Sequence, residues 1–318
     1  MKQPVAANDN FLQILKQPSL WPTLTWVGLL RLLVYLPYRW QLRIGAGFGW
    51  LLSHLARERR HVTHTNLHLC FPGLNATQHQ KMFRDVFRHN GIGIMEAAMA
   101  WWAPESWFKQ RVTLKGREHL DTALAQGKGV IMLGAHFSTL DLGGLLFSFH
   151  YPLNTLYRPN NNPLLDRIIY NGRARFTHNI DRSDFRSVIR KLKNNEIIWY
   201  APDQDFGMKQ SVFVPFFGVP AATLTATTRL AKLNASPILM LAQHRTENGQ
   251  YELELYPAIE PFPTGDLQED ASLINRAIET AIRKDPAQYM WVHRRFKSHP
   301  KGKNYLYRNP PQTESKVP

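Results

Sequence analysis

The chain has 318 residues, enough for one large domain or two smaller ones with a sizeable core. Its 39 Lys and Arg residues exceed its 24 Asp and Glu residues, which gives a formal net charge of +15. This excess indicates an anionic partner, which could be a nucleic acid, an acidic membrane or an acidic substrate. The single cysteine, Cys70, excludes an internal disulfide framework and is typical of a reducing compartment.

An apolar run opens the chain after a polar segment, residues 1–19. Residues 20–36 read "LWPTLTWVGLLRLLVYL" and carry one charge, Arg31. At about 1.5 Å per residue this run approaches the ~30 Å of a hydrocarbon core. Tryptophan and tyrosine flank it as interfacial anchors do, and the arginines that follow it place the rest of the chain on the cytoplasmic side. We therefore expect a membrane anchor over 20–57, either spanning or half-inserted, with a buried core helix as the alternative.

An alternation of helices and short apolar strands follows. A helix is expected over 77–102, with a kink near Gly91 and Gly93. After it, strands are expected at 111–116, 129–134, 153–158, 196–201, 236–243 and 251–257. Helices are expected at 117–127, 137–149, 162–176, 183–195, 223–235 and 269–286. The pattern predicts an α/β domain over 58–307, with a mainly parallel sheet flanked by helices, and a disordered polar tail over 308–318.

The segment "GAHFSTLDLGG", residues 134–144, places an imidazole and a carboxylate five residues apart in an otherwise small and apolar stretch. His136 comes just past the carboxyl end of a predicted strand, where open α/β sheets place their sites, and Asp141 falls in the following helix. One interpretation is a hydrogen-bonded pair at the edge of the core. The other is a general base, because a carboxylate on one ring nitrogen leaves the second free to take a proton.

No nucleophile motif accompanies this pair. The chain contains no G-x-S-x-G sequence, Cys70 lies far from His136 in sequence, and nothing marks the adjacent Ser138 as activated. This favours direct attack by a substrate hydroxyl that His136 deprotonates, rather than a covalent serine enzyme.

Several polar residues are candidate substrate contacts. Arg158, Arg173 and Arg175 could bind phosphate or carboxylate groups, with a solvated basic helix face as the alternative. Asp203 and Gln204 directly follow a strand and could line the site or form a plain turn. Arg294 and Arg295 could contact anionic headgroups or a carrier protein, or belong to a basic surface strand. The segment "YAPDQDFG" contains two acids, Asp203 and Asp205. We predict no metal site there, because no third ligand lies nearby in the sequence.

Seven segments in order along the chain resemble the late acyltransferases of bacterial lipid A synthesis, of the lauroyl-transferase type within the lysophospholipid acyltransferase superfamily. They are "NLHLCFPG" (66–73), "GAHFSTLDLGG" (134–144), "YRPNNNPLLD" (157–166), "GRARF" (172–176), "YAPDQDFG" (200–207), "VPFFGVPAATLTATTRLAKL" (214–233) and "QYMWVHRRFK" (288–297). Many members of this type carry Glu where this chain has Asp141, so the carboxylate is kept but the sub-branch stays open.

The resemblance implies a glycerolipid acyltransferase-like fold and a cofactor-free enzyme at the cytoplasmic face of the bacterial inner membrane. The donor would be a thioester of acyl carrier protein, and the acceptor a hydroxyl of an anionic, Kdo-bearing lipid A precursor. His136 would be the base and Asp141 would orient it. Two alternatives remain: a lysophosphatidate or other glycerolipid acyltransferase, and a non-catalytic lipid-binding membrane protein. A nucleic-acid partner is not expected, because no reading motif is present.

Overall fold

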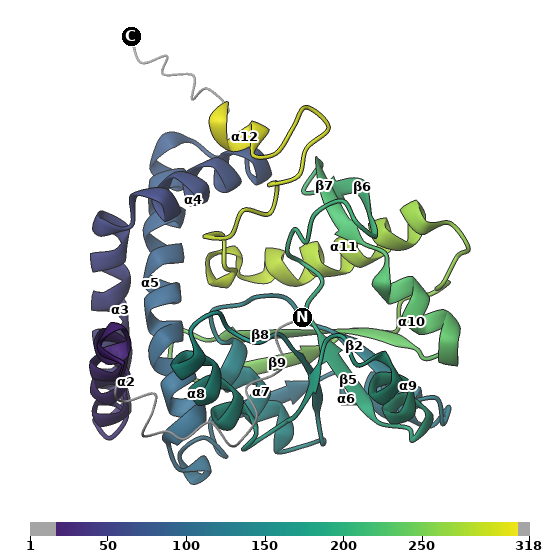
Figure 1. The fold of residues 1–318 in the computed structure, drawn as a ribbon, viewed down its shortest axis with the longest axis horizontal. Helices are drawn as coiled ribbons and strands as arrows, with labels where there is room; N and C mark the ends of the chain where they lie inside the picture. The colour runs from purple at the N-terminus through teal and green to yellow at the C-terminus, as the bar shows by residue number, and fades with distance from the viewer. Residues whose placement is uncertain (1–16, 311–318) are drawn as a thin grey trace.

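A computed structural model describes residues 17–310. Residues 1–16 and 311–318, which hold most of the predicted polar segment and tail, lie outside the described part. A helical layer comes first in the chain and stands at one side of the sheet domain (Figure 1). Its helices are α2 (Trp21–Leu33), α3 (Tyr38–Leu55), α4 (Arg57–Cys70) and α5 (Ala76–Trp102).

The centre of the fold is a seven-stranded sheet of order β1-β9-β8-β2-β5-β3-β4. Every pairing is parallel except the β8–β9 hairpin, which confirms the predicted mainly parallel sheet. The carboxyl ends of β8, β2, β5, β3 and β4 therefore meet at one edge. The strands are β1 (Val112–Lys115), β2 (Val130–Leu133), β3 (Asn154–Tyr157), β4 (His178–Asp181), β5 (Ile197–Tyr200), β8 (Ile238–Arg245) and β9 (Tyr251–Leu255).

Helices cover both faces of this sheet, so its central strands are apolar throughout. Ile131 of β2 belongs to one buried apolar cluster with Ile278 of α11, whereas Met132 belongs to a second cluster with Leu145 of α7. Figure 1 shows α11 and α7 on opposite sides of the sheet. The helices of the sheet domain are α6 (Arg117–Leu124), α7 (Leu140–Ser148), α8 (Pro163–Arg173), α9 (Phe185–Lys193), α10 (Ala226–Asn234), α11 (Leu267–Lys284) and the short α12 (Tyr305–Arg308).

Helix α5 joins the helical layer to the sheet domain. It is helical over all 27 residues, without a break at Gly91 and Gly93, where a kink or loosening is expected from the sequence. These glycines serve close packing instead. A Cβ at Gly91 would collide with the backbone of Gly45 and Gly49 in α3, and one at Gly93 would collide with the carbonyl oxygen of Ser138. Gly93 thus lets the loop after β2 lie against α5.

The apolar run at 20–36 does not form the continuous helix that an anchor crossing the bilayer would need. Helix α2 has 13 residues and ends at Leu33, and α3 begins separately at Tyr38, directly after Pro37. Between residues 17 and 310, no helix combines the length and the apolar character that crossing a membrane requires.

Two features of the sheet domain were missed by sequence analysis. The expected helices at 162–176 and 183–195 leave residues 178–181 as a connection, whereas these residues form β4 and pair with β3 at the sheet edge. The hairpin of β6 (Ser211–Phe216) and β7 (Val219–Leu224) was also missed, and its end was assigned to a helix that begins only at Ala226. The hairpin turns at Phe217 and Gly218, both with positive φ.

Candidate active site

A cavity of about 1320 Å³ opens at the carboxyl edge of the sheet, between the helical layer and the sheet domain. One wall is apolar and comes largely from the helical layer, with Trp26, Leu30, Leu52, Ile94 and Trp101. The sheet domain supplies most of the polar lining residues, including His136, Arg158 and Gln204, together with further apolar side chains. The volume of the cavity exceeds the ~300–1,000 Å³ of sites for drug-sized ligands, so the cavity has room for a long-chain substrate.

His136 lies on the wall of this cavity, just past β2, as predicted. Its Nδ1 is 2.7 Å from Oδ1 of Asp203, and its backbone N–H donates to Oδ2 of the same carboxylate at 2.9 Å. The side chain of His136 is 22 % exposed and that of Asp203 is fully buried. With Nδ1–H donated to the carboxylate, Nε2 carries the lone pair and can accept a proton from a ligand in the cavity.

Asp203 is held as a carboxylate by its surroundings. Burial alone would raise its pKa, but the His136 imidazole and the hydrogen bonds that the carboxylate accepts lower the pKa to about 2. One of these bonds comes from the buried hydroxyl of Tyr289, which donates to Oδ2 at 2.9 Å. The group facing the imidazole is therefore a fixed negative charge at neutral pH.

Asp141 also lies on the cavity wall, but the predicted contact with His136 is not formed. Its two carboxylate oxygens accept from Arg173, with Nε at 2.6 Å and Nη2 at 3.2 Å. Asp141 is in the first turn of α7 and Arg173 is the last residue of α8, so the pair bridges two helices. The assignment of Asp141 as the residue that orients His136 is corrected: in this structure Asp203 takes that position.

The loop that carries His136 is fixed by a segment near the C-terminus. The N–H of Ser138 donates to the carbonyl oxygen of Gln288 at 2.7 Å, and the N–H of Met290 donates to the carbonyl oxygen of His136 at 2.9 Å. Phe137 and Tyr289 thereby form an isolated antiparallel bridge. The same segment supplies the Tyr289 hydroxyl, so it holds both members of the imidazole–carboxylate pair.

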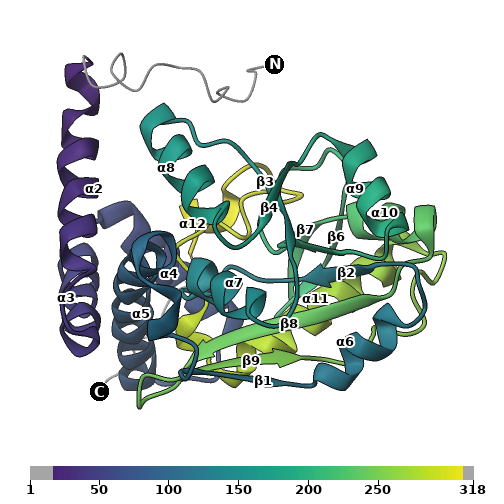
Figure 2. The ribbon, with the colours of Figure 1, turned by 90° about the horizontal axis from the view of Figure 1, so that it is seen from below.

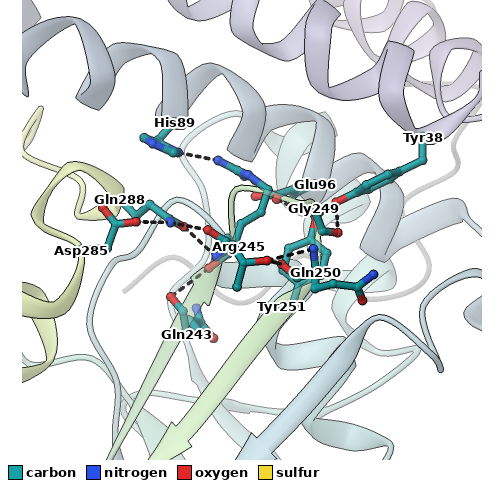
Figure 3. A network of polar contacts seen from close by, with 12 residues as sticks. Tyr38, His89, Glu96, Gln243, Arg245, Gly249, Gln250, Tyr251, Asp285 and Gln288 are labelled. Carbon is teal, nitrogen blue, oxygen red and sulfur yellow. Dashed lines mark hydrogen bonds and ion pairs between the residues drawn. The ribbon is translucent and has the colours of Figure 1, made fainter. Parts of the chain in front are cut away.

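A buried polar network anchors that segment (Figure 3). The side-chain amide of Gln288 exchanges two hydrogen bonds with the main chain of Arg245, at 2.9 and 2.7 Å. The Arg245 guanidinium lies between Glu96 of α5, at 2.5 Å, and the ring of His89. Burial and the charge of Arg245 lower the pKa of His89 to about 4, so this imidazole stays neutral and accepts. The network ties α5 to the end of β8 and, through Gln288, to the His136 loop.

The remaining predicted contacts divide into two groups. Arg158, Arg173 and Gln204 line the cavity, as expected of substrate contacts. Arg175 instead donates to the carbonyl oxygens of Ala100 and Ala103 at the end of α5.

The two arginines near the C-terminus also lie elsewhere. Arg295 is buried and donates to Ala222 and Thr223 of the hairpin, and Arg294 pairs with Glu58 at 3.4 Å. Neither is among the residues that line the cavity. Within residues 17–310, no group of three or more His, Cys, Asp or Glu side chains could hold a metal ion.

Comparison with known proteins gives one consistent result. Residues 9–298 match the model of a family described as bacterial lipid A biosynthesis acyltransferase. The chain is 38 % identical over 296 residues to the lipid A biosynthesis lauroyltransferase of Escherichia coli (strain K12), covering 92 % of this chain and 97 % of that relative. It is 36 % identical over 293 residues to the palmitoleoyltransferase of the same pathway and strain, covering 91 % and 95 %. A lipid A biosynthesis acyltransferase of Haemophilus influenzae is 38 % identical, covering 89 % and 92 %.

The fold, the cavity with its imidazole and these relatives together define an acyltransferase that acts on a lipid. The chain belongs to the bacterial lipid A biosynthesis acyltransferase family, and the reaction this supports is acyl transfer to a lipid A precursor.

Proposed function

We propose that the enzyme moves a fatty acyl group from an acyl carrier protein thioester to a hydroxyl of a Kdo-bearing lipid A precursor, with His136 as the general base. The observation that carries the mechanism is the imidazole held by a buried carboxylate on the wall of a large, partly apolar cavity. In the step, Nε2 of His136 takes the proton of the acceptor hydroxyl, and the oxygen attacks the thioester carbonyl. The C–S bond then breaks, and the leaving thiolate takes the proton from the imidazolium.

Two groups near the site argue against a covalent intermediate. The Oγ of Ser138 is buried and forms no hydrogen bond within the described part of the chain, so His136 does not activate it. Burial raises the pKa of the Cys70 thiol well above its ordinary value, and this residue does not line the cavity. Direct attack by the acceptor hydroxyl is the simplest course that the side chains support.

In this proposal Asp203 is the carboxylate that orients His136 and stabilises its charged form. Asp141 has a different role: it holds the Arg173 guanidinium against the cavity wall through two hydrogen bonds. Arg173 can then bind an oxygen of the substrate with its remaining N–H donors.

Purified enzyme supplied with acyl carrier protein thioester tests the reaction directly. We expect an acylated product with a Kdo-bearing lipid A precursor, detected by mass spectrometry, and none with lysophosphatidate. Acylation of lysophosphatidate alone would contradict the proposal and indicate a glycerolipid acyltransferase. Binding of both lipids without transfer would indicate a lipid-binding protein without this activity.

We also propose that the enzyme works at the cytoplasmic face of the bacterial inner membrane, with α2 and α3 lying in one leaflet. Many large apolar side chains of these two helices and of the link between them are exposed, and we call this surface the α2–α3 face: Trp21, Trp26, Leu29, Leu32, Tyr35, Trp40, Trp50, Leu51, Leu52 and Leu55. Exposed arginines accompany them, which suits an anionic lipid surface. Trp26 and Leu52 also line the cavity, so acyl chains could enter it from the leaflet.

Binding to vesicles tests this placement. Trp50 and Leu55 are 65 % and 68 % exposed, so replacing both with Glu should lower partitioning into phosphatidylglycerol-containing vesicles by about tenfold or more. Trp107 and Leu233, at 40 % and 57 % exposed, provide the matched control, and the same substitutions there should leave sedimentation with vesicles unchanged. Equal binding by both double variants and the parent enzyme would contradict the proposed surface.

A further inference from the structure

Two arginines lie side by side where neighbouring strands end. Strands β3 and β4 are parallel, and Tyr157 is paired with Asp181. Arg158 and Arg182 are the next residues of each strand, and the N–H of Arg182 donates to the carbonyl oxygen of Tyr157 at 3.0 Å. Adjacent strands are about 4.8 Å apart, so the two residues start from neighbouring backbone positions. Both line the cavity.

Neither arginine is neutralised by the protein. Among residues 17–310, no carboxylate lies within 4.0 Å of the Arg158 or Arg182 guanidinium. The nearest acids in sequence bind other donors: Asp181 accepts from Ser183, and Asp184 accepts from the N–H of Ser187 at 3.0 Å. Two like charges placed next to each other without a counter-charge are unfavourable. An anion in the cavity would relieve this repulsion.

A third cation joins them from another loop at the same edge of the sheet. Lys209 follows β5, which is the neighbour of β3, and it also lines the cavity without an ion pair to any described residue. Figure 2 shows β3 and β4 side by side, between α8 and α9. The three positive side chains thus come from three loops that open into one space.

We propose that Arg158, Arg182 and Lys209 form a phosphate-binding subsite of the cavity. A phosphate monoester carries about two negative charges, and each guanidinium can bind it through two N–H donors. In the sheet order, β3 and β4 are the second and third strands from β2, which ends at His136. At about 4.8 Å per strand, the phosphate lies roughly 10–15 Å from the imidazole.

This inference rests on the proposed function, because it assigns a phosphate of one of the two substrates to the site. The phosphate could come from the sugar of the acceptor or from the phosphopantetheine arm of the donor. Both sources share the chemistry that the arginines recognise. Because the subsite lies in the same cavity as His136, the bound phosphate would set which hydroxyl or carbonyl reaches the base.

Kinetics of Arg158→Gln, Arg182→Gln and the double variant test the subsite. With a phosphorylated lipid A precursor we expect KM to rise about tenfold for each single variant and about 100-fold for the double variant. With the same precursor after removal of its phosphates, the parent and variant enzymes should give equal KM values. The double variant Arg186→Gln/Lys193→Gln removes two charges from exposed positions outside the cavity and should behave as the parent.

Kinetics with different acyl donors distinguish an acceptor phosphate from a donor phosphate in the subsite. A rise in KM for the acyl carrier protein thioester, absent with an acyl thioester that lacks the phosphate, would place the donor phosphate in the subsite. Equal KM values for every phosphorylated substrate in parent and double variant would overturn the proposal. So would an equal rise with the phosphate-free acceptor and the phosphate-free donor.

A binding measurement separates this inference from the proposed reaction. Titration of the phosphorylated precursor in detergent can be made with His136→Ala enzyme, in which turnover is not needed. Weaker binding by the double arginine variant in that background, with binding of the dephosphorylated precursor unchanged, supports the subsite even if no transfer occurs. Unchanged binding of the phosphorylated precursor overturns the subsite and leaves the proposed reaction standing.

Discussion

His136→Ala is expected to lower the rate of acyl transfer by about 10²–10⁴-fold, the usual contribution of a positioned general base. The physical reason is that the acceptor hydroxyl is a poor nucleophile until Nε2 takes its proton. Initial rates with acyl carrier protein thioester and a lipid A precursor measure the effect. The alanine leaves the buried Asp203 carboxylate without its imidazole partner, so the variant should be less stable than the parent. It should still fold, because the backbone N–H of residue 136 and the Tyr289 hydroxyl continue to donate to that carboxylate.

The matched control for this variant is His119→Ala. His119 lies on α6, outside the cavity, and its only ion-pair partner in the described chain is its neighbour Glu118, at 4.0 Å. The control should keep full activity and the parent's unfolding temperature, whereas His136→Ala should unfold at a lower temperature. Full activity in a folded His136→Ala enzyme would exclude His136 as the base. Loss of activity together with loss of the folded state would call for His136→Gln, which keeps a polar side chain of similar reach.

The sequence predicts the position of His136 at the sheet edge but not the carboxylate that lies beside it, for a reason that lies in the topology. His136 follows an apolar strand, and this position alone predicts the edge of the sheet where sites form. Its carboxylate comes from Asp203, 67 residues later, because β2 and β5 are neighbours in the sheet. These two loops meet because of the order of the strands in the sheet, and that order cannot be read from the pattern of a single sequence.

The predicted contact between Asp141 and His136 rests on their closeness along the chain, which does not make them close in space. The first turn of α7 directs this carboxylate to Arg173 at the end of α8. Tyr289 and Gln288 were missed for a related reason. They belong to the short 3-10 helix Pro286–Gln288 and the irregular chain after it, which lie beside the His136 loop through contacts such as the bridge between Phe137 and Tyr289. In the segment "QYMWVHRRFK" the sequence predicts substrate contacts at the arginines. The structure instead shows its first two residues, Gln288 and Tyr289, bonded to the His136 loop and to Asp203.

The N-terminal helices show what composition can and cannot predict. The apolar and aromatic content of residues 20–57 indicated a lipid partner, and α2 and α3 do expose many large apolar side chains. Composition could not predict the geometry, in which Pro37 separates two helices and the second, α3, packs against α5 through Gly45 and Gly49. The structure leaves an apolar surface where a spanning helix was considered.

Asp203→Asn is expected to lower kcat by a large factor, up to about 10⁴, because an orienting carboxylate fixes both the tautomer and the charge of its histidine. An amide at this position can present its NH₂ group to Nδ1, which leaves Nε2 protonated and unable to act as a base. The binding of substrates should change little, so KM should stay close to the parent value. Asp141→Asn is the comparison, and there we expect a smaller loss of kcat with a rise in KM, because Arg173 loses its charged partner.

Stability against acid provides a second readout for the same variant. The pKa of Asp203 is about 2 in the folded protein and 3.8 ordinarily, so its carboxylate stabilises the fold above pH 4 by about 2 kcal/mol. This contribution is lost as the pH falls from about 4 to about 2. The parent enzyme should therefore lose stability over that range more steeply than Asp203→Asn, as measured by urea unfolding. Full activity in Asp203→Asn with none in Asp141→Asn would return the orienting role to Asp141, and equal acid sensitivity would show that the Asp203 carboxylate is not held as the structure indicates.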